Sequence, residues 1–213
     1  MATLVKWFRR ALSVVGRYRR AYVIINLAYY GLVAIAMTFV TFHPEIQDAL
    51  IQSVAASFSQ GPLAGVAAAY MGGHVLQSMA MTFAFNFFVG SVVVLMAPSM
   101  LVPFAGLFIG LVRATLWGLL LAPTTPQLQA VMIPHTLTLL IEGQGYVLAI
   151  LGAWILGRAF TSPSSVAADS WREGYARGLR NAAQVYLLVA AVLAIAAVYE
   201  ALEVIYLVPL LLS

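Results

Sequence analysis

The chain has 213 residues, of which 63% are hydrophobic and 8% are charged, and its net charge is +4. Charged residues make up about 25% of an ordinary soluble domain. This composition therefore excludes a sizeable water-soluble catalytic domain and indicates an integral membrane protein. The absence of cysteine excludes disulfides, thiolate metal sites, iron–sulfur clusters and cysteine nucleophiles.

The few charges are gathered in short segments. All Lys and Arg residues except Arg113 fall into two clusters: Lys6, Arg9, Arg10, Arg17, Arg19 and Arg20, and then Arg158, Arg172, Arg177 and Arg180. From Ala49 to Val112 there is no Asp, Glu, Lys or Arg, which leaves room for two membrane crossings and a connection. The apolar runs are continuous and lack the alternation of barrel strands, so the spans are expected to be helices. The predicted fold class is an all-α, polytopic helical membrane protein.

The amino-terminal segment 1–20 is predicted to be an amphipathic helix. Trp7, Phe8, Leu12 and Val15 recur at helical spacing, while the basic residues lie on other faces. Such a helix lies in the membrane interface above anionic lipids. A nucleic-acid patch would need a fold beneath it, and none is indicated here. The predicted partner of this segment is thus the lipid bilayer and not nucleic acid.

Five transmembrane helices are predicted within a single domain, 21–213. The expected spans are 21–42, 74–97, 104–122, 128–160 and 182–204. Prolines or charged residues bound most of them. The fourth span is too long for one upright crossing, and Pro134 and the Gly-Gln-Gly at 143–145 divide it. We therefore expect one broken or re-entrant helix there, with the break at 143–145.

The basic clusters orient these spans. Four crossings separate the amino end from the basic loop near 161–180, so both are expected in the cytoplasm. The carboxyl end then lies outside. Read in this way, the chain is a multi-pass membrane protein. Two full spans within 128–160 would break this agreement.

Polar residues inside the predicted spans are candidate functional residues. They are Asn86, Arg113, His135 and Glu142. A charge in the bilayer costs several kcal/mol unless it is paired or hydrated. Arg113 and Glu142 are the only opposite charges in this region. A buried ion pair between the third and fourth crossings would avoid the cost of leaving either charge unpaired. Such a pair could fix helix register or belong to a proton or ion pathway.

No catalytic or metal-binding motif accompanies these residues. His135 and Glu142 lie seven residues apart, whereas metal ligands on one helix are usually four or fewer apart, and no third ligand lies nearby. Motifs of zinc proteases, serine hydrolases and nucleotide-binding proteins are missing. The sequence therefore predicts no enzyme, no cofactor and no metal site. An intramembrane hydrolase around His135 and Glu142 is kept only as a remote alternative.

Small residues at four-residue spacing are predicted to lie where helices pack closely. They are Gly106 and Gly110 in the third span, and Ala149, Ala153 and Gly157 in the fourth. Such packing would occur within the chain or between copies of it.

A family resemblance covers roughly residues 82–160. The segment Ile133-Pro134-His135, followed by Glu142, the run 146–153 and Gly157, resembles the Pro-His, Glu and small-residue helix pattern of the stage II sporulation protein M family. Asn86 and the run 105–110 are similar to that family's Asn and Asn-Gly-x-x-x-Gly features. The chain departs from the pattern in the seven-residue spacing from His135 to Glu142, in Ala105 at the usual Asn position, and in lacking Pro-Ala after the glutamate.

The resemblance implies an α-helical, multi-pass protein of the plasma (inner) membrane of a prokaryote, without established chemistry. Sporulation members of that family serve in a complex that remodels peptidoglycan during engulfment, although nothing in this chain points to sporulation itself. The first functional hypothesis is therefore a scaffold or assembly protein that acts with membrane or envelope partners or as a homo-oligomer. The alternative is a small transporter or channel component that uses Arg113, His135 and Glu142.

Overall fold

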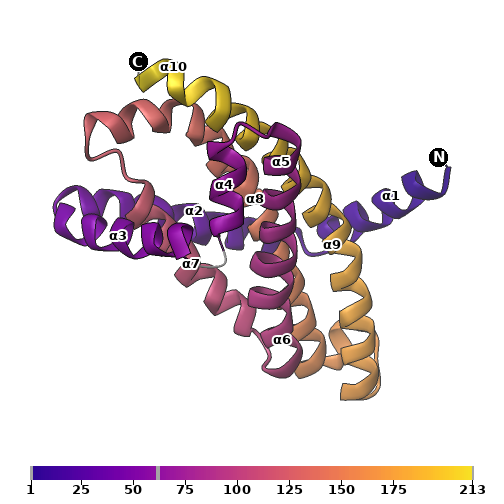
Figure 1. Cartoon of the computed structure of the whole chain (residues 1–213). Coiled ribbons are helices and arrows are strands. Elements are labelled where there is room, and N and C mark those ends of the chain that lie inside the picture. Colours follow the sequence, from indigo (N-terminus) through magenta and orange to yellow (C-terminus); the bar gives the residue numbers. More distant parts are fainter. Residues whose placement is uncertain (1, 61–62, 213) are drawn as a thin grey trace.

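The computed structural model describes residues 2–60 and 63–212, and this part of the chain is helical with no β-strand. Figure 1 shows the helices and their order along the chain. The α-helices are α1 (Ala2–Arg17), α2 (Arg19–Thr41), α3 (Pro44–Gln60), α4 (Ala64–Met71), α5 (Val75–Ala84), α6 (Ala97–Leu101), α7 (Ala105–Leu121), α8 (Pro126–Thr161), α9 (Trp171–Leu202) and α10 (Val208–Leu212). Two π-helical segments, η1 (Phe85–Met96) and η3 (Glu203–Leu207), and one 3₁₀ turn, η2 (Pro163–Val166), connect some of them.

Four of the described helices are long and apolar enough to cross a membrane, which makes this a helical membrane protein. They are Arg19–Thr41, Val75–Leu101, Pro126–Thr161 and Trp171–Leu212. The second consists of α5, η1 and α6, and the fourth of α9, η3 and α10. The remaining predicted span corresponds to α7, which is apolar but has only 17 residues.

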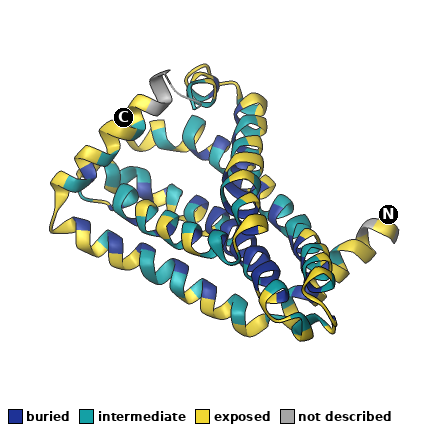
Figure 2. Ribbon diagram, turned by 90° about the horizontal axis from the view of Figure 1, so that it is seen from below, coloured by how far each residue is buried: buried dark blue, intermediate teal, exposed yellow. Residues whose placement is uncertain are grey.

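Helix α8 is the central helix of the bundle. In its most apolar stretch 72% of the residues are buried, against 28% in α2. Figure 2 shows this as a dark blue helix among ribbons that are largely yellow and teal. Helix α9 packs along α8, and α2, α7 and η1 also contact it. A helix surrounded by protein is the position in which polar side chains can be paired away from lipid.

The predicted break at 143–145 is wrong. The helical backbone is continuous from Pro126 to Thr161. Gly143 and Gly145 serve close packing instead: a Cβ on Gly143 would lie 2.7 Å from the Tyr30 hydroxyl, and one on Gly145 would lie 2.5 Å from Leu193 Cδ2. Figure 1 shows the axis of α8 bending in its amino-terminal part, which contains Pro134. A proline removes one helical N–H donor and commonly produces such a bend.

The amino-terminal helix α1 is followed at once by α2, with Tyr18 alone between them. Its Ala11 and Val14 are buried, and the helix packs against α9. Trp7 and Leu12 remain exposed, at 54% and 59%. This segment thus presents both a protein-facing side and an exposed apolar side.

The Gln47 side chain of helix α3 forms hydrogen bonds to the end of α7. The Gln47 amide donates to the carbonyl oxygens of Leu120 and Ala122, both at 2.9 Å, and Gln47 also accepts a hydrogen bond from Thr124. The last carbonyls of a helix have no partner within it. Gln47 therefore satisfies the Leu120 carbonyl in the last turn of α7 and brings the segment after α2 beside the turn between α7 and α8.

The five small residues predicted for close packing are buried on α7 and α8. A Cβ on Gly106 would lie 2.3 Å from the Leu95 carbonyl oxygen and 2.9 Å from Ala153 Cβ. A Cβ on Gly110 would lie 2.4 Å from two atoms of Ile150. At Gly106 an added side chain would meet backbone and separate the helices, whereas at Gly110 it would have to displace the Ile150 side chain.

We expect Gly106→Ala to destabilise the protein by about 2 kcal/mol, because the added methyl group meets backbone and cannot be accommodated by a rotamer change. The matched control is Gly31→Ala in α2, where an added Cβ meets nothing within 4 Å. SDS-induced unfolding in mixed micelles measures both free energies of unfolding. Equal stability of the two variants would contradict the close approach of α7 to η1.

Candidate functional site: an intramembrane polar cluster

Arg113 and Glu142 lie close together in the membrane-spanning region. Arg113 Nη2 of α7 is 4.0 Å from Glu142 Oε1 of α8. The same nitrogen donates a 2.6 Å hydrogen bond to the Tyr146 hydroxyl, and the guanidinium lies 4.1 Å from the centre of the Tyr146 ring. The centre of the Trp117 ring lies 5.5 Å from the same guanidinium. The guanidinium is thus held by two aromatic rings and a hydroxyl, and its ion pair with Glu142 is long.

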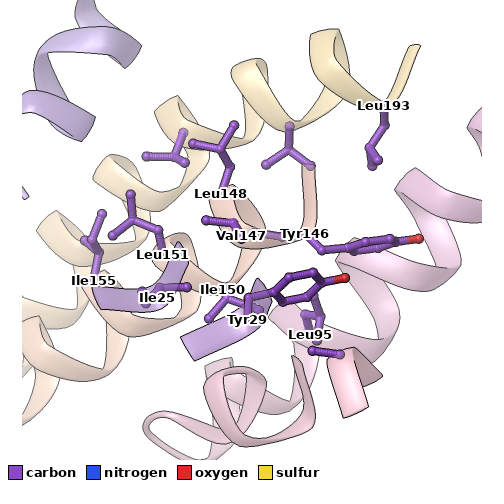
Figure 3. Packing of buried hydrophobic residues seen from close by; sticks show 14 of the residues in the cluster. Ile25, Tyr29, Leu95, Tyr146, Val147, Leu148, Ile150, Leu151, Ile155 and Leu193 are labelled. Atoms are coloured by element: carbon purple, nitrogen blue, oxygen red, sulfur yellow. The ribbon is translucent and has the colours of Figure 1, made fainter. Parts of the chain in front are cut away.

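Figure 3 shows where this part of the cluster meets the apolar core. The rings of Tyr29 and Tyr146 lie near one another, and their hydroxyls point to the same side, away from Ile25 and Ile155. Both side chains are only 1% exposed. They therefore mark the boundary between the apolar packing and the polar cluster.

His135 pairs with a different glutamate from the one that its helix face suggests. His135 Nδ1 lies 2.9 Å from Glu203 Oε1, at the first residue of η3. The Thr138 hydroxyl, one turn along α8, donates to the other carboxylate oxygen of Glu203. Glu203 is fully buried. One carboxylate therefore connects two successive turns of α8 to the distal part of the last span.

A third carboxylate, Glu200, lies beside these two pairs. It interacts electrostatically with Glu142, His135 and Glu203, and it lies next to the Tyr70 hydroxyl. Its Oε2 is buried and has no hydrogen-bond partner among the described residues, and the same holds for Glu142 Oε1. Buried polar atoms without a partner are uncommon and costly.

The sequence did not single out Glu200 and Glu203, although it placed them near the end of the last span. The available signal was two carboxylates three residues apart in an otherwise apolar helix, which places both on one helix face. Which partner they meet depends on the packing of α9 and η3 against α8. Of the predicted residues, Asn86 is not part of this cluster. It is buried in η1, and its backbone carbonyl accepts a 3.0 Å hydrogen bond from the Ser91 hydroxyl.

The charges of the cluster do not balance. The cluster contains three carboxyl groups, one guanidinium near Glu142, and one imidazole that binds Glu203 and lies near Glu200. Even with His135 protonated, three ionised glutamates would leave one negative charge in excess. Within the described residues no group of three or more His, Cys, Asp or Glu is arranged to hold a metal ion.

A small cavity adjoins the cluster. It is lined by side chains of α2, α7 and α8, including Tyr29, Trp117, His135 and Glu142. Its volume of about 10 Å³ leaves room for about one water molecule.

A second polar network joins α8 to α2. The Gln144 amide donates to Asn26 at 2.7 Å and to the Tyr30 hydroxyl at 3.1 Å, while its oxygen accepts from the Tyr22 hydroxyl at 2.7 Å. The Tyr30 hydroxyl in turn donates to the Leu140 carbonyl at 2.8 Å. The side of α8 toward α2 is thus held by neutral hydrogen bonds, whereas the cluster itself uses charged groups.

Comparisons with protein-family models, with curated proteins and with solved structures give no match for this chain. The resemblance of residues 82–160 to the stage II sporulation protein M family therefore stands on the sequence features alone.

Proposed function

We propose that this chain is a multi-pass membrane scaffold, without catalytic chemistry of its own, on which partner membrane or envelope proteins assemble. The observation that carries the proposal is that the strong contacts of the polar cluster each join two helices. Arg113 of α7 binds Tyr146 of α8, and His135 of α8 binds Glu203 of η3. Contacts of this kind fix the relative positions of helices. The adjoining cavity, with room for about one water, also favours a structural role over a conducting path.

The proposal includes five crossings, with the amino end in the cytoplasm and the carboxyl end outside. Helix α7 serves as the third crossing, since 17 residues lie at the lower limit for a helical span. Two observations support the number of crossings, because they group the helix ends as five crossings require. Arg17 to Arg20 and Arg158 line one groove, as expected for two cytoplasmic segments, and Gln47 meets Leu120 at the opposite, external end.

Single cysteines test this topology, because the chain has none of its own. In intact cells, a membrane-impermeant maleimide should label Gln52→Cys and Gln127→Cys, which lie after the first and third crossings. Ser13→Cys and Ser164→Cys should react only after the membrane is permeabilised. Labelling of Gln52→Cys and Gln127→Cys on opposite sides would reject α7 as a crossing.

The resemblance to the stage II sporulation protein M family supports the choice of a prokaryotic inner membrane and of an assembly role. On this proposal the partner is another membrane protein, an envelope protein or a second copy of the chain. The exposed apolar residues of the spans, such as Leu27 at 70% and Phe108 at 66%, supply surface for lipid or for such a partner.

A second candidate function is a proton-coupled transporter or channel component. The observation that favours it is the excess of carboxyl groups around Glu200, together with the partnerless oxygens of Glu142 and Glu200. A proton held by one of these carboxyls would balance the charge. Intramembrane carboxyl groups of this kind occur in proton relays.

Proton flux into liposomes separates the two candidates. For a scaffold, the purified chain should admit protons no faster than protein-free liposomes do under an imposed pH gradient, read with an enclosed pH dye. Flux above that background that is lost in Glu142→Gln and kept in Glu45→Gln would overturn the scaffold proposal. Glu45 is the suitable control, because its side chain is 70% exposed outside the cluster.

A further inference from the structure

A groove of about 850 Å³ opens where the two basic clusters meet. This volume lies within the range of ligand pockets in proteins. The junction of α1 and α2 forms one wall, and α7, α8 and η2 complete the lining. The groove is separate from the polar cluster, because the two share no lining residue.

Four arginines line this groove: Arg17, Arg19, Arg20 and Arg158. All four are exposed, and in the part of the chain that the structure describes none has a carboxylate at ion-pair distance. No Asp or Glu lines the groove either. The groove therefore carries an uncompensated positive charge that an anionic group would neutralise.

The groove becomes apolar with distance from the arginines. Along α2, Arg19 and Arg20 are followed by Ile24 and Ala28, one and two turns deeper. Helix α7 adds Leu107 and Leu111. The site thus has a cationic end and an apolar end, which is the distribution that an amphiphile requires.

Aromatic and hydroxyl groups occur at the same level as the arginines. The Tyr18 and Trp154 rings pack edge to face with centres 5.8 Å apart, and the Arg158 guanidinium lies 5.4 Å from the Trp154 ring. Trp and Tyr favour the headgroup region of membranes. Ser165 also lines the groove. Its Oγ is buried and has no hydrogen-bond partner among the described residues. A phosphate oxygen is an acceptor that this hydroxyl lacks.

We propose that this groove is a binding site for an anionic phospholipid. The phosphate lies among Arg17, Arg19, Arg20 and Arg158, and an acyl chain extends along α2 and α7 toward Ala28 and Leu111. Basic pockets between membrane helices recognise anionic headgroups in this way. The lipid would hold the amino-terminal helix against α7 and α8, whichever function the polar cluster serves.

The test measures phosphatidylglycerol binding to the full chain in detergent by native mass spectrometry. The groove variant is Arg19→Ala with Arg158→Ala. Its matched control is Arg9→Ala with Arg10→Ala, which removes the same charge from exposed positions of α1 outside the groove. We expect the groove variant to bind at least tenfold more weakly than the control. A second variant, Ala28→Phe, keeps every charge, fills the apolar end and should also weaken binding.

Comparison ligands complete the test. Phosphatidylcholine should bind more weakly than phosphatidylglycerol, and inorganic phosphate at the same concentration should not displace the lipid. Equal losses in the groove and control variants would overturn the proposal, because they would indicate general attraction to the basic amino terminus. Displacement by phosphate alone, or equal binding of phosphatidylcholine, would also overturn it. Full phosphatidylglycerol binding by Ala28→Phe would reject the acyl-chain path.

Discussion

Glu203→Ala is expected to destabilise the protein by about 3 kcal/mol, the range found when one partner of a buried pair is removed. The fully buried carboxylate of Glu203 accepts from Thr138 and binds His135 Nδ1 at 2.9 Å. Its loss leaves both α8 side chains without this partner and frees the distal part of the last span. The free energy of unfolding in SDS-titrated micelles is the quantity to measure.

Two further variants separate the possible causes of that loss. Glu45→Ala removes a carboxylate whose pair with His43, at 3.3 Å, is exposed, so it should change stability by well under 1 kcal/mol. Glu203→Gln keeps the shape and an acceptor oxygen, and it should recover part of the stability lost in the alanine variant. A Glu203→Ala protein as stable as Glu45→Ala would contradict the contact between α8 and η3.

Arg113→Ala is expected to cost about 3 kcal/mol by leaving Glu142 in the bundle without its cation. Removing Glu142 as well should restore part of that loss, because no unpaired charge then remains. The double variant Arg113→Ala with Glu142→Ala should therefore be less damaged than the sum of the single variants. A double-mutant cycle on unfolding free energies measures this coupling.

The hydrogen bond from Arg113 to Tyr146 requires a correction to that cycle. Tyr146→Phe removes the hydroxyl but keeps the ring that stacks on the guanidinium. It should cost about 1.5 to 3 kcal/mol by itself, as for a hydrogen bond to a charged group. Strictly additive losses in the Arg113 and Glu142 cycle would show that the 4.0 Å approach contributes no interaction energy.

The sequence predicted the helical class and most of the spans because these depend on local composition. Uncharged runs must form helices in a bilayer whatever their neighbours are. It did not predict the continuity of α8, since Gly143 and Gly145 are compatible both with a break and with close packing. Tyr30 and Leu193, which lie far away in the sequence, decide between the two by occupying the space beside these glycines.

The candidate site shows the same division. The sequence identified Arg113 and Glu142 as the opposite charges of the central spans, and the structure places them 4.0 Å apart. It related His135 to Glu142 by their shared helix face, whereas His135 lies against Glu203, 68 residues later. A contact across two helices depends on their relative rotation and depth, which periodicity along one helix does not contain.

By itself, the sequence thus determined a helical membrane protein with two basic segments and a few buried ionisable residues, because hydropathy and charge are properties of short windows. Only the tertiary structure decided that Glu142 lies near Arg113, that Glu203 and Glu200 lie near His135, and that both basic segments line one groove. The physical reason is that pairing depends on how the helices pack. Close approach at small residues such as Gly106 sets the spacing at which their side chains meet.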